Sequence, residues 1–238
     1  MGWIEYWDDK PTIYVSRRHR EAHYRCVADG LGANLGDGRP VVLDFGCGEA
    51  LFADDVAVRC SRLYLCDAAP SVRAELQRRF ASVQNIVVVA PEDLASLPAA
   101  SLDLVVANSV IQYLSAADLD RCLEDWKRLL APAGRLLLAD VIPPKVGPLT
   151  DALALLDFAR REGFLVAAFA GLVRTFFSSY RKVRAELGLQ QYEADTLLQR
   201  LAAHGLSARR HHPNLGHNQA RMAFIATLAD TKVAGTHV

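Results

Sequence analysis

Short apolar runs alternate with amphipathic stretches along the first 141 residues of the chain. The apolar runs have the length of buried strands, and they lie at residues 41–45, 62–66, 86–89, 102–107 and 134–141. The stretches between them carry helix start and stop residues, and they predict helices at residues 16–31, 50–58, 70–81 and 116–130. This alternation predicts an α/β fold with a doubly wound, mostly parallel sheet. Such a sheet binds ligands at the carboxyl ends of its strands.

The pattern changes after residue 145. Residues 149–187 are expected to be helical, as two helices broken near Gly163, and to cap the ligand site. A helix follows at residues 193–204, and after it a two-stranded hairpin with strands at 206–212 and 220–228. No linker divides the chain, so we expect one domain over residues 1–238. Its parts are an N-terminal lid segment at residues 1–38, a core at 41–141, a helical cap insert at 145–190 and a C-terminal part at 193–228.

The composition narrows the class of protein. Hydrophobic residues make up 51% of the 238 residues, which is enough for a sizeable core. The net charge of +0 argues against nucleic-acid binding, which needs a basic surface. The five cysteines are odd in number and contain no C-x-x-C pair. They are therefore expected to be reduced thiols of a cytoplasmic protein, with neither a disulfide framework nor a metal site.

The segment from Val41 to Ala50, with the sequence VVLDFGCGEA, carries the strongest chemical signal. A buried strand passes into two glycines, Gly46 and Gly48, which allow a ligand to approach the main chain. The helix that follows would direct its free N–H groups at that ligand. A dinucleotide fingerprint would need a small residue at Leu51. The small residue is instead Ala50, and D-x-G-x-G-x-A resembles motif I of the class I S-adenosylmethionine-dependent methyltransferases.

Three further segments extend this resemblance, in the right order, over residues 41–141. Residues 93–98 are similar to D-A-x-x-L-P, residues 108–114 to S-V-L-x-H/Y-L, and residues 129–136 to the L-K-P-G-G segment of the type 11, small-molecule group. The resemblance implies a Rossmann-like sheet of seven strands with an antiparallel last strand. It also implies S-adenosylmethionine as the cofactor.

The acids that follow the second and third strands are the first candidates for cofactor contacts. Asp67 lies 19 residues after Gly48, where a carboxylate can accept both ribose hydroxyls, or else cap the helix that starts at Pro70. The resemblance implies that Asp93 accepts the adenine amine, with Glu92 as the competing acid; the alternative is a solvated loop charge. The full set of expected cofactor residues is Asp44, Gly46, Cys47, Gly48, Asp67, Ala68, Asp93, Leu94, Asn108, Gln112, Tyr113 and Tyr14.

Two departures from the family pattern keep other functions open. Ala50 replaces the last glycine of motif I, and the histidine of the family's E-H-L triplet is absent from Gln112-Tyr113-Leu114. A module that binds S-adenosylmethionine without catalysis therefore remains an alternative to an enzyme. A nicotinamide-dependent oxidoreductase is a further alternative, against which Leu51 counts.

The loop of the C-terminal hairpin is expected on the same rim as the cofactor. It supplies three candidate general bases, His211, His212 and His217, followed by Asp140 at the end of the fifth strand. Further candidates on the N-terminal segment are His19, Tyr14 and Tyr24. The neighbouring basic residues, Arg209, Arg210 and Arg221, would suit an anionic acceptor; the alternative is a solvated basic hairpin.

The cap insert is expected to choose the acceptor. Residues 164–173 are apolar on all sides, and residues 158–188 hold more basic than acidic side chains. This combination predicts a small-molecule, lipid-like or carrier-bound acceptor, or a peripheral contact with a membrane. The alternative is a buried cap helix with a solvated basic end.

Overall fold

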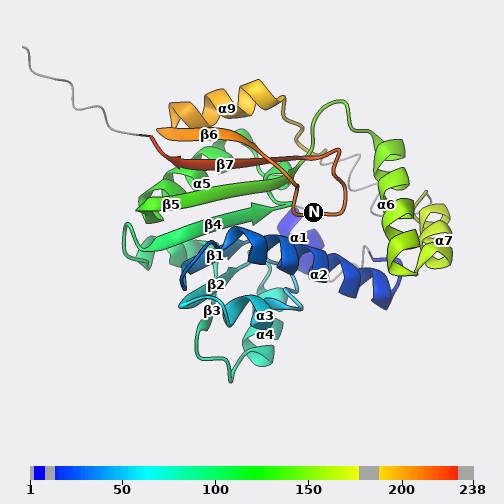
Figure 1. Cartoon of the computed structure of the whole chain (residues 1–238), viewed down its shortest axis with the longest axis horizontal. Coiled ribbons are helices and arrows are strands. Elements are labelled where there is room, and N and C mark those ends of the chain that lie inside the picture. Colours follow the sequence, from blue (N-terminus) through cyan, green and yellow to red (C-terminus); the bar gives the residue numbers. More distant parts are fainter. Residues whose placement is uncertain (1–2, 9–13, 177–187, 230–238) are drawn as a thin grey trace, which may run out of the picture.

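The computed structural model describes residues 3–8, 14–176 and 188–229. Its centre is a seven-stranded sheet in the order β3-β2-β1-β4-β5-β7-β6 (Figure 1). Strands β1 to β5 are parallel, and β7 runs antiparallel to both β5 and β6. The predicted fold class, including the antiparallel last strand, is confirmed. The strands are β1 (Val41–Phe45), β2 (Arg62–Cys66), β3 (Ile86–Val89), β4 (Leu102–Asn108), β5 (Leu130–Val141), β6 (Leu206–His211) and β7 (Met222–Leu228).

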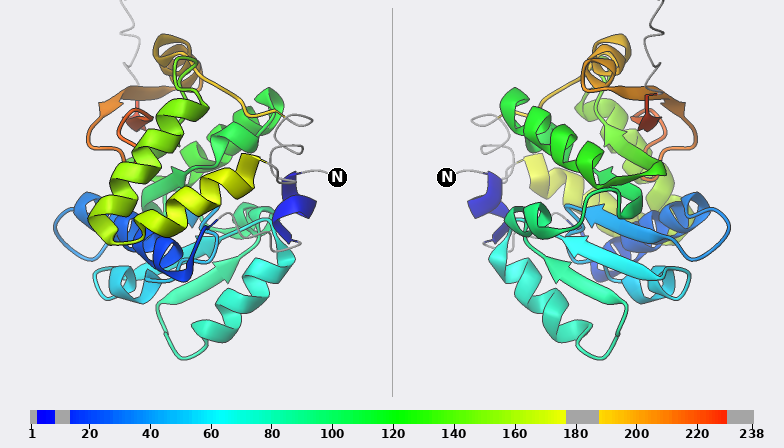
Figure 2. Two further views of the ribbon diagram at one scale, coloured as in Figure 1. Left: turned by 90° about the vertical axis from the view of Figure 1, so that its right-hand side faces the viewer. Right: turned by 90° about the vertical axis from the view of Figure 1, so that its left-hand side faces the viewer.

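Helices cover both faces of the sheet, as the two views of Figure 2 show. Side chains of α2, α3 and α4 pack against one face, and side chains of α5 and α9 pack against the other. The helices of these two layers are α2 (Arg17–Asn34), α3 (Ala53–Ala57), α4 (Pro70–Arg79), α5 (Ala116–Leu129) and α9 (Ala194–Ala203). Two short 3₁₀ turns, η1 (Pro91–Ser96) and η2 (Ile111–Tyr113), follow β3 and β4.

Strand β5 begins four residues earlier than the sequence pattern predicts. Leu130 already pairs with Leu102 of β4, and the register shifts before the next pair. Gly134 lies at this irregularity, where a Cβ atom would come within 2.7 Å of the Leu102 carbonyl oxygen. Helix α5 ends at Leu129, so the Pro132-Ala133-Gly134 segment lies within β5 and does not itself stop the helix.

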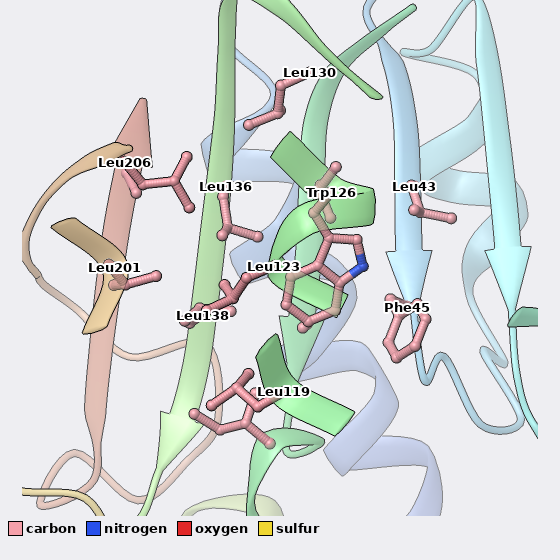
Figure 3. Close-up of a cluster of buried hydrophobic side chains, with 14 of the residues drawn as sticks. Leu43, Phe45, Leu119, Leu123, Trp126, Leu130, Leu136, Leu138, Leu201 and Leu206 are labelled. Carbon is pink, nitrogen blue, oxygen red and sulfur yellow. The ribbon is translucent and has the colours of Figure 1, made fainter. Parts of the chain in front are cut away.

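The larger hydrophobic cluster is built around Trp126 of α5 (Figure 3). Its ring packs edge-on against Phe45 of β1, with 5.1 Å between the ring centroids. Leu119 and Leu123 precede it on the same helical face, because residues three and four apart lie above one another. All three α5 side chains are fully buried, and each such side chain stabilises the fold by about 1.5–3 kcal/mol.

The cap consists of α6 (Pro148–Glu162) and α7 (Leu165–Phe176), which lie beside α2 (Figure 2). Gly163 adopts a left-handed conformation, with φ of +74°, and ends α6. The predicted break near Gly163 is confirmed; the part of the predicted helix beyond Phe176 lies outside the described residues. Phe158, Phe164 and Ala168 form a small core of their own and hold the cap against α2. Among the described residues, no helix is long and apolar enough to cross a membrane.

Candidate functional site

The turn after β1 requires its two glycines. Gly46 and Gly48 have φ of +72° and +56°, a region that suits glycine. A Cβ on Gly46 would lie 2.3 Å from Cγ2 of Val110, and a Cβ on Gly48 would lie 2.8 Å from the hydroxyl of Tyr24. The side chain of Val110, just before η2, and that of Tyr24 in α2 therefore pack against the main chain of the turn.

Asp67 lies at the end of β2 and binds the same turn. Its Oδ2 accepts a hydrogen bond from the Gly48 N–H at 3.0 Å, and its Oδ1 accepts one from the Ala69 N–H at 2.9 Å. The residue at the N-cap of α4 is Ala69, so Asp67 does not cap that helix. The sequence separation of 19 residues thus corresponds to direct contact between the acid and the glycine turn.

A second carboxyl group, that of Asp44, lies close to Asp67. Burial, followed by the charge of Asp67, raises the pKa of Asp44 to about 7. Burial likewise raises the pKa of the Cys47 thiol well above its usual value, so this cysteine is an uncharged side chain of small size. The turn is therefore flanked by two acids and no thiolate.

Asp93 lies in the 3₁₀ turn that follows β3. Its Oδ2 accepts a hydrogen bond from the Ala90 N–H at 2.8 Å, so the carboxylate caps its own turn. The neighbouring Leu94 is buried in the main core, whereas Asp93 is exposed. The adenine contact implied for Asp93 stays a prediction, and the structure gives this residue a local structural role.

Two amide side chains on the rim beyond β4 have buried oxygen atoms that accept no hydrogen bond from the described residues. Oδ1 of Asn108, at the end of β4, and Oε1 of Gln112, in η2, have no hydrogen-bond partner among the described residues. An unpaired buried acceptor costs about 1–3 kcal/mol. A ligand with a cationic amine would relieve this cost, which fits the methionine end of S-adenosylmethionine.

The first helix, α1 (Trp3–Asp8), packs on the same rim. The rings of Trp3 and Trp7 lie 4.6 and 5.8 Å from the ring of Tyr113. Oδ1 of Asp8 accepts a hydrogen bond from the Ser71 N–H of α4 at 2.7 Å. The helix thus bridges the elements that follow β2 and β4, as the predicted lid segment would have to do.

Comparison with known proteins agrees with this geometry. Residues 43–138 match the model of the methyltransferase domain family. The chain carries a class I S-adenosylmethionine-dependent methyltransferase domain. An uncharacterized methyltransferase of Mycobacterium tuberculosis is 29% identical over 124 residues, 52% of this chain and 60% of that protein. Nodulation protein S of Rhizobium tropici is 27% identical over 125 residues, 52% of this chain and 50% of that protein. The match thus spans about half the length of these relatives.

Solved structures show the same fold. The DhpI–SAH complex superposes with a TM-score of 0.59 at 15% identity, over 95% of both chains. The YcgJ protein of Bacillus subtilis superposes with a TM-score of 0.55 at 15% identity, over 79% of this chain and 70% of that chain. Because the sequence identity is only 15%, these superpositions show a shared arrangement of helices and strands.

The residues around the glycine turn fit S-adenosylmethionine, the cofactor of this class of enzyme. When bound, this cofactor supplies an electrophilic methyl group. The glycine turn brings the main chain close to the ligand, Asp67 can accept the ribose hydroxyls, and Asn108 and Gln112 can accept the amine.

A substitution of Asp67 tests the ribose contact. Asp67→Ala should weaken binding of S-adenosylhomocysteine by roughly 10- to 100-fold, about 1.5–3 kcal/mol, through loss of charge-assisted hydrogen bonds.

Isothermal titration calorimetry measures this change, and Asp37→Ala is the control because Asp37 is exposed in the loop before β1. An Asp67→Ala variant that keeps its affinity would contradict the ribose assignment.

A second group of polar side chains lies around Asp140, near the end of β5. Asp140 and Ser109 both have positive φ, +58° and +57°, and the Ser109 hydroxyl donates to Asp140 Oδ2 at 2.5 Å. The same Oδ2 accepts from Arg221 Nη1 at 2.6 Å, and Oδ1 accepts from Asn214 Nδ2 at 3.3 Å. Backbone strain at two adjacent strand ends is typical of functional sites.

Arg221 connects this carboxylate to the cap. Its Nη2 and Nε donate to both oxygens of Asp151, at 3.1 and 3.3 Å, and Asp151 belongs to the first turn of α6. All three side chains are largely buried. The arginine expected to attract an anionic acceptor is thus already paired with two carboxylates, which the local sequence could not show because both lie outside the hairpin.

The three histidines of the hairpin occupy different places. His217 stacks on Phe158 of α6, with 4.6 Å between the ring centroids, and its buried Nδ1 has no partner among the described residues. Burial lowers the pKa of His217, while the charge of Asp140 raises it. The backbone of His211 instead pairs with that of Ala223 where β6 runs beside β7, and His212 is exposed. The structure therefore brings His217 and Asp140 together and leaves His211 and His212 outside this group.

The sequence reasoning missed His23, which lies on α2 four residues after His19. Its ring contacts those of Tyr14 and Tyr24, at 5.4 and 5.2 Å between centroids. Burial is the largest cause that lowers the pKa of His23 to about 4, followed by His217. The i, i+4 spacing of two histidines on one helical face was the available signal.

Proposed function

We propose that the chain is a cytoplasmic enzyme that transfers the methyl group of S-adenosylmethionine to a small or lipid-like acceptor bound beneath α6. One observation carries the proposal: at the carboxyl ends of β4 and β5 the Ser109 hydroxyl donates to Asp140, and the charge of Asp140 acts on His217, whose ring stacks on Phe158 of the cap. The five cysteines are all free, which suits a reducing compartment.

The chain's own residues would mainly align the two reactants. Methyl transfer from a sulfonium needs little covalent help, and a base is needed only when the acceptor is a neutral hydroxyl, amine or acidic carbon. His217 suits that task, because burial keeps the imidazole neutral and Asp140 lies close enough to stabilise the imidazolium. Both oxygens of Asp140 already accept hydrogen bonds from other side chains, so we assign Asp140 an electrostatic role beside His217.

The outer face of the cap supports access by an apolar acceptor. Val166 and Phe169 of α7 are 86% and 66% exposed, and Leu165 is exposed beside them. An apolar helix face of this kind suits contact with a lipid-like or carrier-bound acceptor, or with a membrane surface.

Turnover measurements test the proposal. Formation of S-adenosylhomocysteine is measured with a panel of hydroxyl, amine and carboxylate acceptors, and the parent protein should methylate at least one of them. His217→Ala should then lower kcat by roughly 10²- to 10⁴-fold, the usual worth of a general base, while S-adenosylhomocysteine affinity stays unchanged.

The double variant His211→Ala/His212→Ala is the matched comparison, because both residues lie outside the group around Asp140. Full activity of His217→Ala would remove that histidine from the mechanism. Cofactor binding without transfer to any acceptor would favour the non-catalytic module.

A further inference from the structure

Two side chains of α2, Arg20 and Tyr24, contact the chain where it leaves the glycine turn. They lie four residues apart, on one face of the helix. The Tyr24 hydroxyl accepts a hydrogen bond from the Glu49 N–H at 2.9 Å, and Arg20 Nη1 lies 3.3 Å from Oε2 of the same Glu49. The close approach of the Tyr24 hydroxyl to Gly48 joins this group to the turn itself. Helix α2 thus places a cation and a hydroxyl against the segment that fits the cofactor.

Both side chains have further hydrogen bonds to donate. Nε of Arg20 is buried and has no partner among the described residues, which is unfavourable for a charged donor. The Tyr24 oxygen accepts from Glu49, so the hydroxyl can still donate its own proton. The ion pair of Arg20 and Glu49 is half-exposed, and such pairs hold their partners weakly. The guanidinium, which has five N–H donors, can therefore bind a second anion while it keeps Glu49.

The amino-acid end of S-adenosylmethionine carries an ammonium and a carboxylate, and these two groups need opposite partners. The amide oxygens of Asn108 and Gln112, from β4 and η2, are acceptors that suit the ammonium. A carboxylate needs donors instead, and a cation offsets the cost of taking it out of water. That cation matters here because Asp67, which binds the same turn, would repel a second carboxylate. Arg20 and Tyr24 supply the donors and the charge from α2.

We propose that Arg20 and Tyr24 bind the carboxylate at the amino-acid end of the cofactor, with Arg20 Nε and the Tyr24 hydroxyl as donors. An arginine can donate from two of its nitrogens to one carboxylate, which fixes the orientation of that group as well as its position. In this arrangement α2 holds the glycine turn through Glu49 and holds the ligand through its carboxylate. The assignment concerns the cofactor and does not depend on which acceptor is methylated.

Two ligands that differ by one carboxylate test this assignment. S-adenosylhomocysteine has the carboxylate, whereas S-adenosyl-3-thiopropylamine keeps the amine and lacks only the carboxylate. Isothermal titration calorimetry measures both affinities for the parent, for Arg20→Gln and for Tyr24→Phe. We expect the affinity for S-adenosylhomocysteine to fall by about 10- to 100-fold in Arg20→Gln and by about fivefold in Tyr24→Phe. The affinity for S-adenosyl-3-thiopropylamine should change by less than about threefold in both variants, because this ligand has no group for the lost donors to bind.

Two further variants serve as controls. Arg17→Gln, in the first turn of the same helix, should bind both ligands as the parent does, because Arg17 is exposed and pairs with Glu21. Arg20→Lys keeps the charge and loses the planar fork, so it should recover part of the affinity for S-adenosylhomocysteine. Retained binding of S-adenosyl-3-thiopropylamine shows that the turn is intact in each variant.

Two results would overturn the assignment. Equal weakening of both ligands in Arg20→Gln would mean that Arg20 only supports the turn, and an unchanged affinity for S-adenosylhomocysteine would mean that the carboxylate binds elsewhere. Failure of the enzymatic proposal would appear separately, because these affinities do not require methyl transfer to any acceptor.

Discussion

Arg221→Ala is expected to lower the free energy of unfolding by about 3–5 kcal/mol, because it leaves two largely buried carboxylates without their shared cation. Arg221 binds Asp140 at the end of β5 and Asp151 at the start of α6, and these two charges raise its pKa. Removal of the guanidinium would place like charges near one another and detach the cap from the sheet. Urea unfolding followed by circular dichroism measures the change.

Two matched variants sharpen this test. Arg209→Ala, in the same hairpin, should change stability by less than about 0.5 kcal/mol, since Arg209 is exposed. Arg221→Lys should lose an intermediate amount, because an ammonium keeps the charge but cannot bind two carboxylates with one planar fork. If Arg221→Ala unfolded at the same urea concentration as Arg209→Ala, the ion-pair network would not hold the cap.

Asp44→Asn is expected to stabilise the protein at alkaline pH. The folded-state pKa of Asp44, about 7, lies above its unfolded value of about 3.9. As the pH rises between these values, the unfolded chain loses its proton first, so stability falls with increasing pH. By pH 8 the cost is roughly 2–4 kcal/mol, after allowance for the partial exposure of the group. An amide removes this cost.

Urea unfolding at pH 5 and at pH 8 checks the sign of this effect. The stability difference between Asp44→Asn and the parent should grow from pH 5 to pH 8, whereas the exposed Asp37→Asn should show no such trend. A difference that stays constant or shrinks would mean that Asp44 is not destabilised by burial and by Asp67.

The cofactor half of the site was predictable because it follows from local sequence. Gly46 and Gly48 take positive φ at positions where a Cβ would clash, and Asp67 contacts Gly48 because adjacent parallel strands end at one edge of the sheet. Asp93 shows the limit of such reasoning. Its position fits an adenine contact, but only the structure shows its carboxylate bound to the Ala90 N–H.

The acceptor half depends on contacts between segments far apart in the chain. His211, His212 and His217 are equivalent as sequence, yet only His217 reaches Phe158 and Asp140. His23 is an ordinary helical position until the cap and the hairpin close on it. Arg221 seemed available for an anion because the neighbouring sequence holds no acid, and it is paired because α6 and β5 each bring one.

The sequence by itself determined the alternation of strands and helices, the sheet class and the cofactor turn, since these follow from hydrophobic period and glycine placement within short segments. The tertiary structure decided which charges are paired, which imidazoles are buried and which rings pack together. Those properties depend on burial and on neighbours that lie far away in the sequence, and no local pattern of residues encodes them.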